Sequence, residues 1–335
     1  MNERELIIVG GGPAGMAAAV SAYDNGIRDI LVLERAEYLG GILNQCIHTG
    51  FGLEHFKETL TGPEYADRFE TMVRGMPCIE VMLRSFVVGL TADKVLTYLS
   101  PGRRETVKAK ALIMATGCRE KTREMVHIAG TRPAGIFSAG LAQKLINIEG
   151  LMPGRRVVVV GSGDIGLIMA RRFILEGAQV KAVIELKKES RGLLRNMVQC
   201  IEDFEVPVYY RHKISRIIGR DRVEKVEIEK IDDGPDESII SKKVIECDTV
   251  LMSVGLIPEN ELIEMAGVEL DKKTNSPVSD EVNKTSIPGL FVCGNAFKVY
   301  DIVDTVSKDS IEAGHMAAEY LGIVEGRGTR DEGRR

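Results

Sequence analysis

Near its start the chain reads Leu6-Ile7-Ile8-Val9-Gly10-Gly11-Gly12-Pro13-Ala14-Gly15. The four apolar residues predict a buried strand, and the G-x-G-x-x-G turn that follows them opens a helix-compatible stretch from Gly12 to Asn25. A second apolar run then leads to an acid, Glu34. Strand, glycine turn, helix, strand and acid in this order are typical of a unit that binds the pyrophosphate and ribose of a dinucleotide.

The same arrangement occurs a second time. Val157-Val158-Val159-Val160 enters Gly161-Ser162-Gly163-Asp164-Ile165-Gly166, and a further strand leads to Glu185. The same distance, nineteen residues, separates the last glycine from the acid in both copies. The glycines permit a tight turn, a close backbone approach to phosphate and close helix packing, and the helix dipole favours the anion. A lone G-x-G-x-x-G is often only a glycine-rich turn, so the matched pair carries the prediction of two dinucleotide sites and of electron transfer between them.

Composition sets the broad class of protein. The chain has 335 residues, is 44% hydrophobic and has a mean hydropathy of −0.02, which predicts a globular protein with room for two domains. No apolar stretch is long enough for a membrane helix, and the net charge of −5 gives no basic footprint for nucleic acid. The first residues pass directly into the first strand and leave no room for a signal peptide, so we expect a cytoplasmic location.

The cysteines are widely scattered. No C-x-x-C pair is present for thiol–disulfide exchange, and no clustered spacing suits zinc or an iron–sulfur centre. We therefore expect reduced, mostly buried thiols and no metal site. The cysteines are Cys46, Cys78, Cys118, Cys200, Cys247 and Cys293.

Strand patterns predict how the two nucleotide units are joined. Short extended runs from Ile79 to Ala115 indicate a β-meander that ends in Ala115-Thr116-Gly117. The later run from Thr249 to Gly255 has a similar pattern, and two such crossings predict that the second unit is inserted into the first. The expected boundaries are 1–117 with 250–325 for the first domain, 118–249 for the inserted domain, and 326–335 for a flexible tail.

Five motifs in this order resemble the two-dinucleotide flavoproteins, the pyridine nucleotide–disulfide oxidoreductases. The resemblance covers nearly the whole chain and implies an α/β fold with two Rossmann-like domains, each a three-layer ββα arrangement, with the NAD domain inserted into the FAD domain. Asn295 stands where that superfamily usually has Asp; it keeps a carbonyl acceptor and removes the charge, so we expect FAD to bind. The motifs are Gly10 to Gly15 with Glu34, Gly40-Gly41, Ala115-Thr116-Gly117, Gly161 to Gly166 with Glu185, and Thr285 to Asn295.

The resemblance also indicates a branch of this superfamily. The length leads us to expect a protein without the long C-terminal dimerisation domain of the disulfide reductases, and it resembles the compact thioredoxin-reductase-like form without its redox cysteine pair. The run from Gly130 to Gly140 is similar to flavin subunits of heteromeric sarcosine and opine oxidases, and the run from Gly40 to Gly52 is similar to a subunit linked to glycerol-3-phosphate dehydrogenase systems. This implies an oligomer or hetero-complex with a partner dehydrogenase, an iron–sulfur subunit, or both.

The resemblance assigns residues to each cofactor. For FAD they are Gly10, Gly12, Pro13, Ala14, Gly15, Glu34, Arg35, Gly40, Gly41, Ala115, Thr116, Gly117, Gly294, Asn295, Asp304 and Thr305. For the nicotinamide dinucleotide they are Gly161, Gly163, Asp164, Ile165, Gly166, Glu185 and Gly255.

The coenzyme preference follows from charge. Glu185 repels a 2′-phosphate, which favours NAD(H) over NADP(H). Lys187, Lys188 and Arg191 follow closely and are able to reverse that preference.

Three residues after the double glycine are candidates for chemistry at the flavin. Gln45, Cys46 and His48 lie in a segment that lines cofactors in this superfamily. A lone cysteine is more often a buried thiol than a nucleophile, and a lone histidine is more often structural than a proton donor. The helix that starts near Asp304 is expected to point its positive end at the flavin, unless it is simply a core helix.

The sequence therefore predicts an FAD-dependent NADH oxidoreductase that exchanges electrons with a partner subunit oxidising an amine, an amino acid or glycerol 3-phosphate. Two alternatives remain: a stand-alone NADH oxidase that uses oxygen or a quinone, and a non-catalytic flavin-binding scaffold subunit.

Overall fold

A computed structural model describes residues 2–232, 234, 238–279 and 281–325. The expected tail at 326–335 lies outside these residues. The chain divides into two compact units. Unit 1 contains the residues up to Arg119 and those from Ile257 on, and unit 2 runs from Glu120 to Leu256. Within the described ranges, no helix is both long and apolar enough to cross a bilayer.

Unit 1 is built on one sheet in the order β5-β2-β1-β8-β7-β6, with β20 beside β8. Strands β5, β2, β1, β8 and β20 are parallel, and β8-β7-β6 form an antiparallel meander. The elements are β1 (Asn2–Val9), α1 (Pro13–Asp24), β2 (Ile30–Leu33), η1 (Gly41–Gln45), β3 (Thr49–Phe51), β4 (Leu60–Thr61), α2 (Gly62–Arg74), β5 (Ile79–Met82), β6 (Phe86–Leu90), β7 (Val95–Ser100), β8 (Arg103–Met114), α6 (Glu261–Met265), β20 (Leu290–Val292), η3 (Gly294–Ala296) and α7 (Val303–Tyr320).

Two apolar clusters hold the layers of unit 1 together. On one face of the sheet, α1, α2 and α7 pack against residues such as Leu6 and Ile113. On the other face, the β6–β7 hairpin and α6 cover residues such as Ile7 and Leu112, which alternate with the first set along the same strands. Helices, parallel sheet and meander therefore form three layers.

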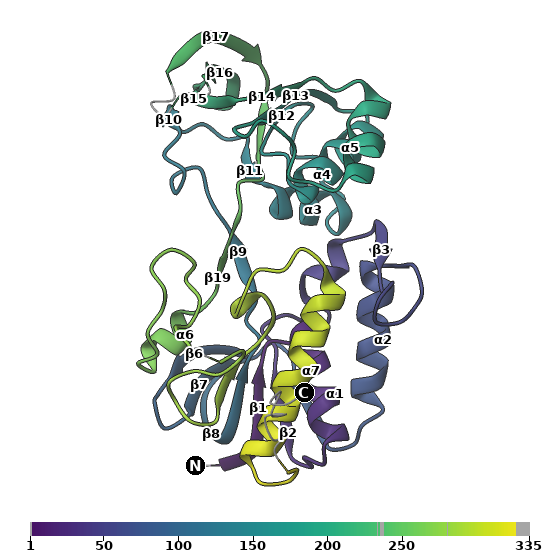
Figure 1. Cartoon of the computed structure of the whole chain (residues 1–335), viewed down its shortest axis with the longest axis vertical. Coiled ribbons are helices and arrows are strands. Elements are labelled where there is room, and N and C mark those ends of the chain that lie inside the picture. Colours follow the sequence, from purple (N-terminus) through teal and green to yellow (C-terminus); the bar gives the residue numbers. More distant parts are fainter. Residues whose placement is uncertain (1, 233, 235–237, 280, 326–335) are drawn as a thin grey trace, which may run out of the picture. The chain divides into compact units, whose positions relative to one another are not determined.

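Small residues set the spacing of the helix layer. Helix α1 starts at Pro13, where the missing N–H of proline costs nothing, and it lies beside α7 (Figure 1). A Cβ on Gly314 of α7 would lie 2.5 Å from the carbonyl oxygen of Ala18. The two helices therefore touch backbone to backbone, which holds α7 closely against α1.

Unit 2 repeats this plan around a parallel sheet in the order β11-β18-β12-β13-β14. Helices α3, α4 and α5 pack on one face, and an antiparallel sheet, with β10 at its edge, covers the other. The elements are β10 (Ala129–Gly130), β11 (Ile136–Ser138), α3 (Ala139–Asn147), β12 (Arg156–Val160), α4 (Asp164–Leu175), β13 (Gln179–Glu185), α5 (Leu194–Cys200), η2 (Glu202–Phe204), β14 (Val208–Tyr210), β15 (His212–Gly219), β16 (Val223–Ile231), β17 (Ile239–Glu246) and β18 (Thr249–Met252).

The predicted α/β class, with two Rossmann-like three-layer units and the second inserted into the first, is confirmed. Two details differ from expectation. The run Val81-Met82-Leu83 was expected in the meander, but β5 pairs in parallel with β2, because α2 returns the chain to the same edge of the sheet. The expected boundary at residue 250 falls inside β18, which pairs with β12 and β11 within unit 2.

Two short strands, β9 (Cys118–Glu120) and β19 (Leu256–Pro258), carry the chain from one unit to the other and pair with each other. On the unit 1 side the Glu259 amide donates to the Gly117 carbonyl (2.9 Å). On the unit 2 side the Lys121 amide donates to the Gly255 carbonyl (2.9 Å). The start and the end of the insertion are therefore hydrogen-bonded neighbours.

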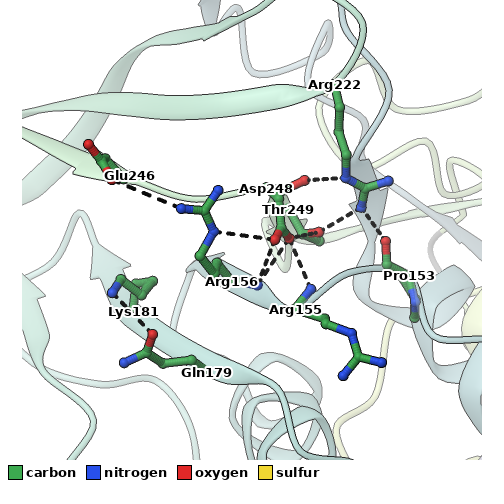
Figure 2. A network of polar contacts seen from close by, with 9 residues as sticks. All are labelled: Pro153, Arg155, Arg156, Gln179, Lys181, Arg222, Glu246, Asp248 and Thr249. Atoms are coloured by element: carbon green, nitrogen blue, oxygen red, sulfur yellow. Dashed lines mark hydrogen bonds and ion pairs between the residues drawn. The ribbon is translucent and has the colours of Figure 1, made fainter.

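A polar network around Asp248 ties together the layers of unit 2 (Figure 2). The Asp248 carboxylate accepts the backbone amides of Arg155 and Arg156 (both 3.0 Å) and the Thr249 hydroxyl (2.9 Å). Arg222, which comes just before β16, donates to the Asp248 carbonyl (2.8 Å) and to the Thr249 hydroxyl (2.9 Å). Burial opposes the charge on Asp248, but these hydrogen bonds outweigh it and hold its pKa below the ordinary value.

Candidate functional site

The first glycine turn, Gly10 to Gly15, follows β1 and presents bare backbone at its glycines; we call it the first cradle. Gly10 has φ +109°, and a Cβ there would lie 2.3 Å from the Ala115 carbonyl oxygen. A Cβ on Gly15 would lie 1.8 Å from the Gly10 carbonyl oxygen. These two glycines are required by packing. A Cβ on Gly12 would meet nothing nearer than 3.9 Å, so this position faces space that a ligand can occupy.

Glu34 is fixed beside this cradle. It directly follows β2, is 7% exposed, and accepts the Gly11 amide on Oε2 (2.6 Å) and the Ala36 amide on Oε1 (2.7 Å). Each carboxylate oxygen has room for a second donor. The side chain is therefore held in place with two acceptor positions left for the hydroxyls of a ribose. Arg35, by contrast, is 61% exposed and lies 3.4 Å from Glu259.

The double glycine forms the other wall of the cradle. Gly40 and Gly41 have φ values of +103° and +55°, and the Gly40 amide donates to the Gly11 carbonyl (2.9 Å). A Cβ on Gly41 would lie 3.1 Å from the Cα of Gly12. The two glycine segments meet backbone to backbone, as close approach to a pyrophosphate requires.

The second turn has the same geometry in unit 2. Gly161 has φ +92°, and its Cβ would lie 2.1 Å from the Ser253 carbonyl oxygen, whereas a Cβ on Gly163 would meet nothing nearer than 3.8 Å. Glu185, at the end of β13, is 4% exposed and accepts the amides of Ser162 (2.9 Å) and Lys187 (2.7 Å).

The other predicted nicotinamide residues surround this turn. Helix α4 starts at Asp164, whose carboxylate accepts the Leu193 amide (2.8 Å) and the Asn196 side-chain amide (2.6 Å). That carboxylate therefore supports the start of α5. Gly255 has φ +109°, and Ile165 packs against the helix layer of unit 2.

The strand ends near the first turn complete the predicted FAD set. The Ala115 amide donates to the Val9 carbonyl (2.9 Å), and the Thr116 hydroxyl donates to the Glu259 carbonyl (2.7 Å). Gly117 has φ +75°, and no atom lies within 4 Å of a Cβ built on it. Asn295 accepts the Tyr300 amide on its carbonyl oxygen (3.0 Å), so the predicted acceptor already holds the next loop.

Asp309, which is not among the predicted site residues, contacts one of them, Gly294. Its carboxylate, in the second turn of α7, accepts the Gly294 amide (2.7 Å), and Gly294 has φ +61°. Burial raises the pKa of Asp309, and the Gly294 amide opposes that shift. No motif marks Asp309 in the sequence, because its partner Gly294 lies in a separate element.

Asp304 and Thr305 lie in the first turn of α7. Asp304 is buried, and its carboxylate accepts the amides of Gly52 (3.1 Å) and His55 (2.9 Å). Asp304 therefore clamps the loop between β3 and β4. Its role toward FAD stays a prediction, as does that of the half-buried Thr305.

The three catalytic candidates fall in and after η1, directly beyond Gly41. Gln45 is buried, and the ring of His48 lies 5.0 Å from the ring of Phe51, with Nδ1 3.2 Å from the Thr49 carbonyl oxygen. Burial raises the pKa of Cys46 to about 12, so its thiol is protonated at neutral pH. The placement fits a cofactor-lining segment, and the protonated thiol does not suit a nucleophile.

Both cradles fit a dinucleotide. In each unit the outer glycines are closed by packing, the middle glycine faces open space, and a fixed acid stands beside it. A glycine at a position where a larger side chain would fit is expected where a ligand lies directly against the backbone.

The comparisons with known proteins agree with this geometry. The chain is 28% identical to an opine oxidase subunit of Agrobacterium tumefaciens over 87% of the chain and 61% of that protein. It is 26% identical to the HcnB subunit of the hydrogen cyanide synthase of Pseudomonas protegens over 78% of the chain and 59% of that protein. The chain therefore spans about 60% of the length of these two relatives.

Solved structures share the fold. T. acidophilum thioredoxin reductase matches with a TM-score of 0.77 and 23% identity, over 97% of this chain and 100% of that one. The profile of the pyridine nucleotide-disulphide oxidoreductases matches residues 4–319. The chain therefore belongs to the pyridine nucleotide-disulphide oxidoreductase family, whose members are FAD-dependent enzymes that use NAD(P)H.

Proposed function

We propose that this chain is an FAD-dependent NAD(H) oxidoreductase that exchanges electrons with a partner subunit of a multi-subunit dehydrogenase. One observation carries the proposal: two glycine cradles, each open at its middle glycine and each with a fixed acid beside it. A protein that holds two dinucleotides is suited to move a hydride between them.

In this proposal unit 1 is the FAD-binding domain and unit 2 is the NAD(P)-binding domain. The flavin and the nicotinamide supply the redox chemistry, and the protein binds them, orients them and excludes water. Glu34 would accept the ribose hydroxyls of FAD, and the Gly10 to Gly15 turn would hold its pyrophosphate. The Gly161 to Gly166 turn would hold the pyrophosphate of the coenzyme, and Glu185 would accept from its ribose. The charge of Glu185 favours NAD(H).

A partner is proposed because the chain offers no relay of its own. The sequence has no C-x-x-C pair, none of the six cysteines is joined in a disulfide, and burial keeps Cys46 protonated. Two relatives are named as subunits of larger enzymes, an opine oxidase and a hydrogen cyanide synthase. Both observations support transfer to another subunit that oxidises an amino acid, an amine or glycerol 3-phosphate. The expected reduced state of the thiols also suits a cytoplasmic location.

The test of hydride transfer is anaerobic mixing of the FAD-loaded protein with NADH in a stopped-flow spectrophotometer. We expect the visible flavin absorption band to bleach. Persistence of the band at saturating NADH, with FAD shown to be bound, would refute the proposed hydride transfer.

The test of the partner is co-purification from native extract, with flavin and metal analysis of the complex. We expect the isolated chain to consume oxygen slowly with NADH, and the complex to reduce FAD with the partner's substrate. Rapid, stoichiometric production of hydrogen peroxide by the isolated chain would instead identify an NADH oxidase.

A further inference from the structure

The acids of the two cradles differ in how many donors their own protein supplies. Glu34 receives one backbone amide on each carboxylate oxygen, from Gly11 and Ala36. Glu185 receives the equivalent amides of Ser162 and Lys187. It receives in addition the Ser162 hydroxyl, 2.6 Å from Oε2, the oxygen that already accepts the Ser162 amide.

The two acids therefore differ in the number of acceptor positions that they keep for a ligand. A carboxylate oxygen accepts two hydrogen bonds in its plane. Glu34 therefore keeps one position on each oxygen, enough for both ribose hydroxyls. On Glu185, Oε2 is filled by Ser162, and only Oε1 keeps a position. The first cradle can hold a ribose through two acceptors, and the second through one.

The Ser162 hydroxyl is held in this orientation. Ser162 is fully buried. Its oxygen accepts the Arg191 amide (3.3 Å), so its proton is directed to Glu185. Its carbonyl accepts the Gly192 amide (2.9 Å) and the Ser190 hydroxyl (3.1 Å). The hydroxyl is thus part of the frame that holds the loop after β13, and it is not free to rotate toward a ligand.

That loop brings positive charge to the same place. Lys187, Lys188 and Arg191 line an open depression of about 530 Å³, together with Glu189 and Ser190. A phosphate on the 2′ position of a ribose beside Glu185 would meet the repulsion of one carboxylate and the attraction of these cations. The hydroxyl of Ser162 weakens the repulsion between Glu185 and the 2′-phosphate, because a hydrogen bond donated to a carboxylate partly neutralises its negative charge.

We propose that Ser162 is a specificity-determining residue, whose hydroxyl occupies an acceptor position of Glu185 and narrows the preference of unit 2 for NAD(H) over NADP(H). The inference rests on the proposed function, since it concerns the coenzyme of that same site. We therefore expect unit 2 to bind both coenzymes, with a modest preference for NAD(H).

The experiment measures binding and not turnover. The full-length, FAD-loaded protein is titrated by calorimetry with ADP-ribose and with 2′-phospho-ADP-ribose, which lack the nicotinamide. We expect wild-type protein to bind the first more tightly by less than about tenfold. Ser162→Ala frees Oε2, while the Ser162 and Lys187 amides still hold the carboxylate. This variant should raise the ratio of the two affinities about tenfold, the value of one hydrogen bond to a charged group.

Two further variants make the result specific. Ser215→Ala, in β15, removes a hydroxyl that donates to the Glu227 carbonyl (3.2 Å), and it should leave the ratio unchanged. Glu185→Gln should abolish the preference for ADP-ribose. Adding Ser162→Ala to Glu185→Gln should then change the ratio little, because no charge remains to unmask.

An unchanged ratio in Ser162→Ala would overturn the inference, and so would an equal loss of affinity for both fragments, which would mark Ser162 as purely structural. Failure of wild-type protein to bind either fragment would overturn the inference and the nucleotide site together. Binding of both fragments with the expected ratios, but without flavin reduction by NADH, would refute the proposed function and leave the inference standing.

Discussion

Substitution of Gly10 and of Gly12, two glycines of the first turn, should separate effects on folding from effects on cofactor binding. Gly10→Ala places a methyl group 2.3 Å from a backbone carbonyl oxygen, at φ +109°. The backbone strain costs about 1–3 kcal/mol, and the overlap with immobile backbone adds to it. We expect the free energy of unfolding of unit 1 to fall by about 3 kcal/mol or more.

Gly12→Ala should behave in the opposite way. Its φ is −75°, which alanine adopts, and the nearest atom lies 3.9 Å from the added carbon. The gain from a less flexible unfolded chain and the loss of a favourable helix cap nearly cancel, so the free energy of unfolding should change by less than about 1 kcal/mol. The methyl group instead fills the cradle, and FAD affinity should fall at least about tenfold.

The assay has two readouts on the same samples. Urea denaturation of FAD-free protein, monitored by hydrogen exchange in β1 and α1, reports the stability of unit 1. Flavin absorbance after gel filtration reports the amount of bound FAD. Gly161→Ala and Gly163→Ala repeat the comparison in unit 2, with Gly161 the closed position and Gly163 the open one. A Gly12→Ala protein that keeps its full FAD content would refute the assignment of this cradle to a dinucleotide.

Three other perturbations address single contacts. Asp248→Asn should lower the free energy of unfolding of unit 2 by about 1–3 kcal/mol. Hydrogen bonds depress the pKa of Asp248 below 3.8 against the effect of burial, so this loss of stability should be complete at neutral pH and should shrink as the pH falls through that lowered pKa. Urea titrations at neutral pH and at a pH below the lowered pKa will measure the difference. Cys46→Ser should leave the rate of flavin reduction by NADH within about twofold of wild type in stopped-flow mixing, since a thiol with a pKa of about 12 is not a nucleophile at neutral pH; a large loss would assign Cys46 a chemical role. Asp304→Ala should release the Gly52–His55 loop and increase its cleavage in limited proteolysis followed by mass spectrometry, and unchanged cleavage would show that other contacts hold the loop.

The parts of the fold that could be predicted are those with a local chemical cause. A glycine that must adopt positive φ, such as Gly10 or Gly161, and an acid at a fixed distance after it are visible in the sequence because each has one structural solution. The insertion of one unit into the other was predicted from the similar strands that end each segment. The boundary near residue 250 was misplaced because β18 has the same apolar pattern whether it belongs to one sheet or the other.

Contacts that join distant parts of the chain could not be predicted. Asp309 and Gly294 are neighbours only because α7 packs along the sheet, and nothing in the residues around Asp309 marks it. The bond between the Ser162 hydroxyl and Glu185 depends on a rotamer that a sequence does not specify. The Asp304 clamp shows the same limit, since an acid at a helix start suggests a ligand or a cap, and its partners lie in the loop before α2.

The pairing of β9 with β19 has a consequence for engineering. Adjacent strands lie about 5 Å apart, so a turn of a few residues can reconnect the chain where unit 2 is removed, and a second turn can close the excised piece. Each half is thereby a candidate for separate expression, and foreign nucleotide-binding modules with adjacent termini become interchangeable cassettes at this junction.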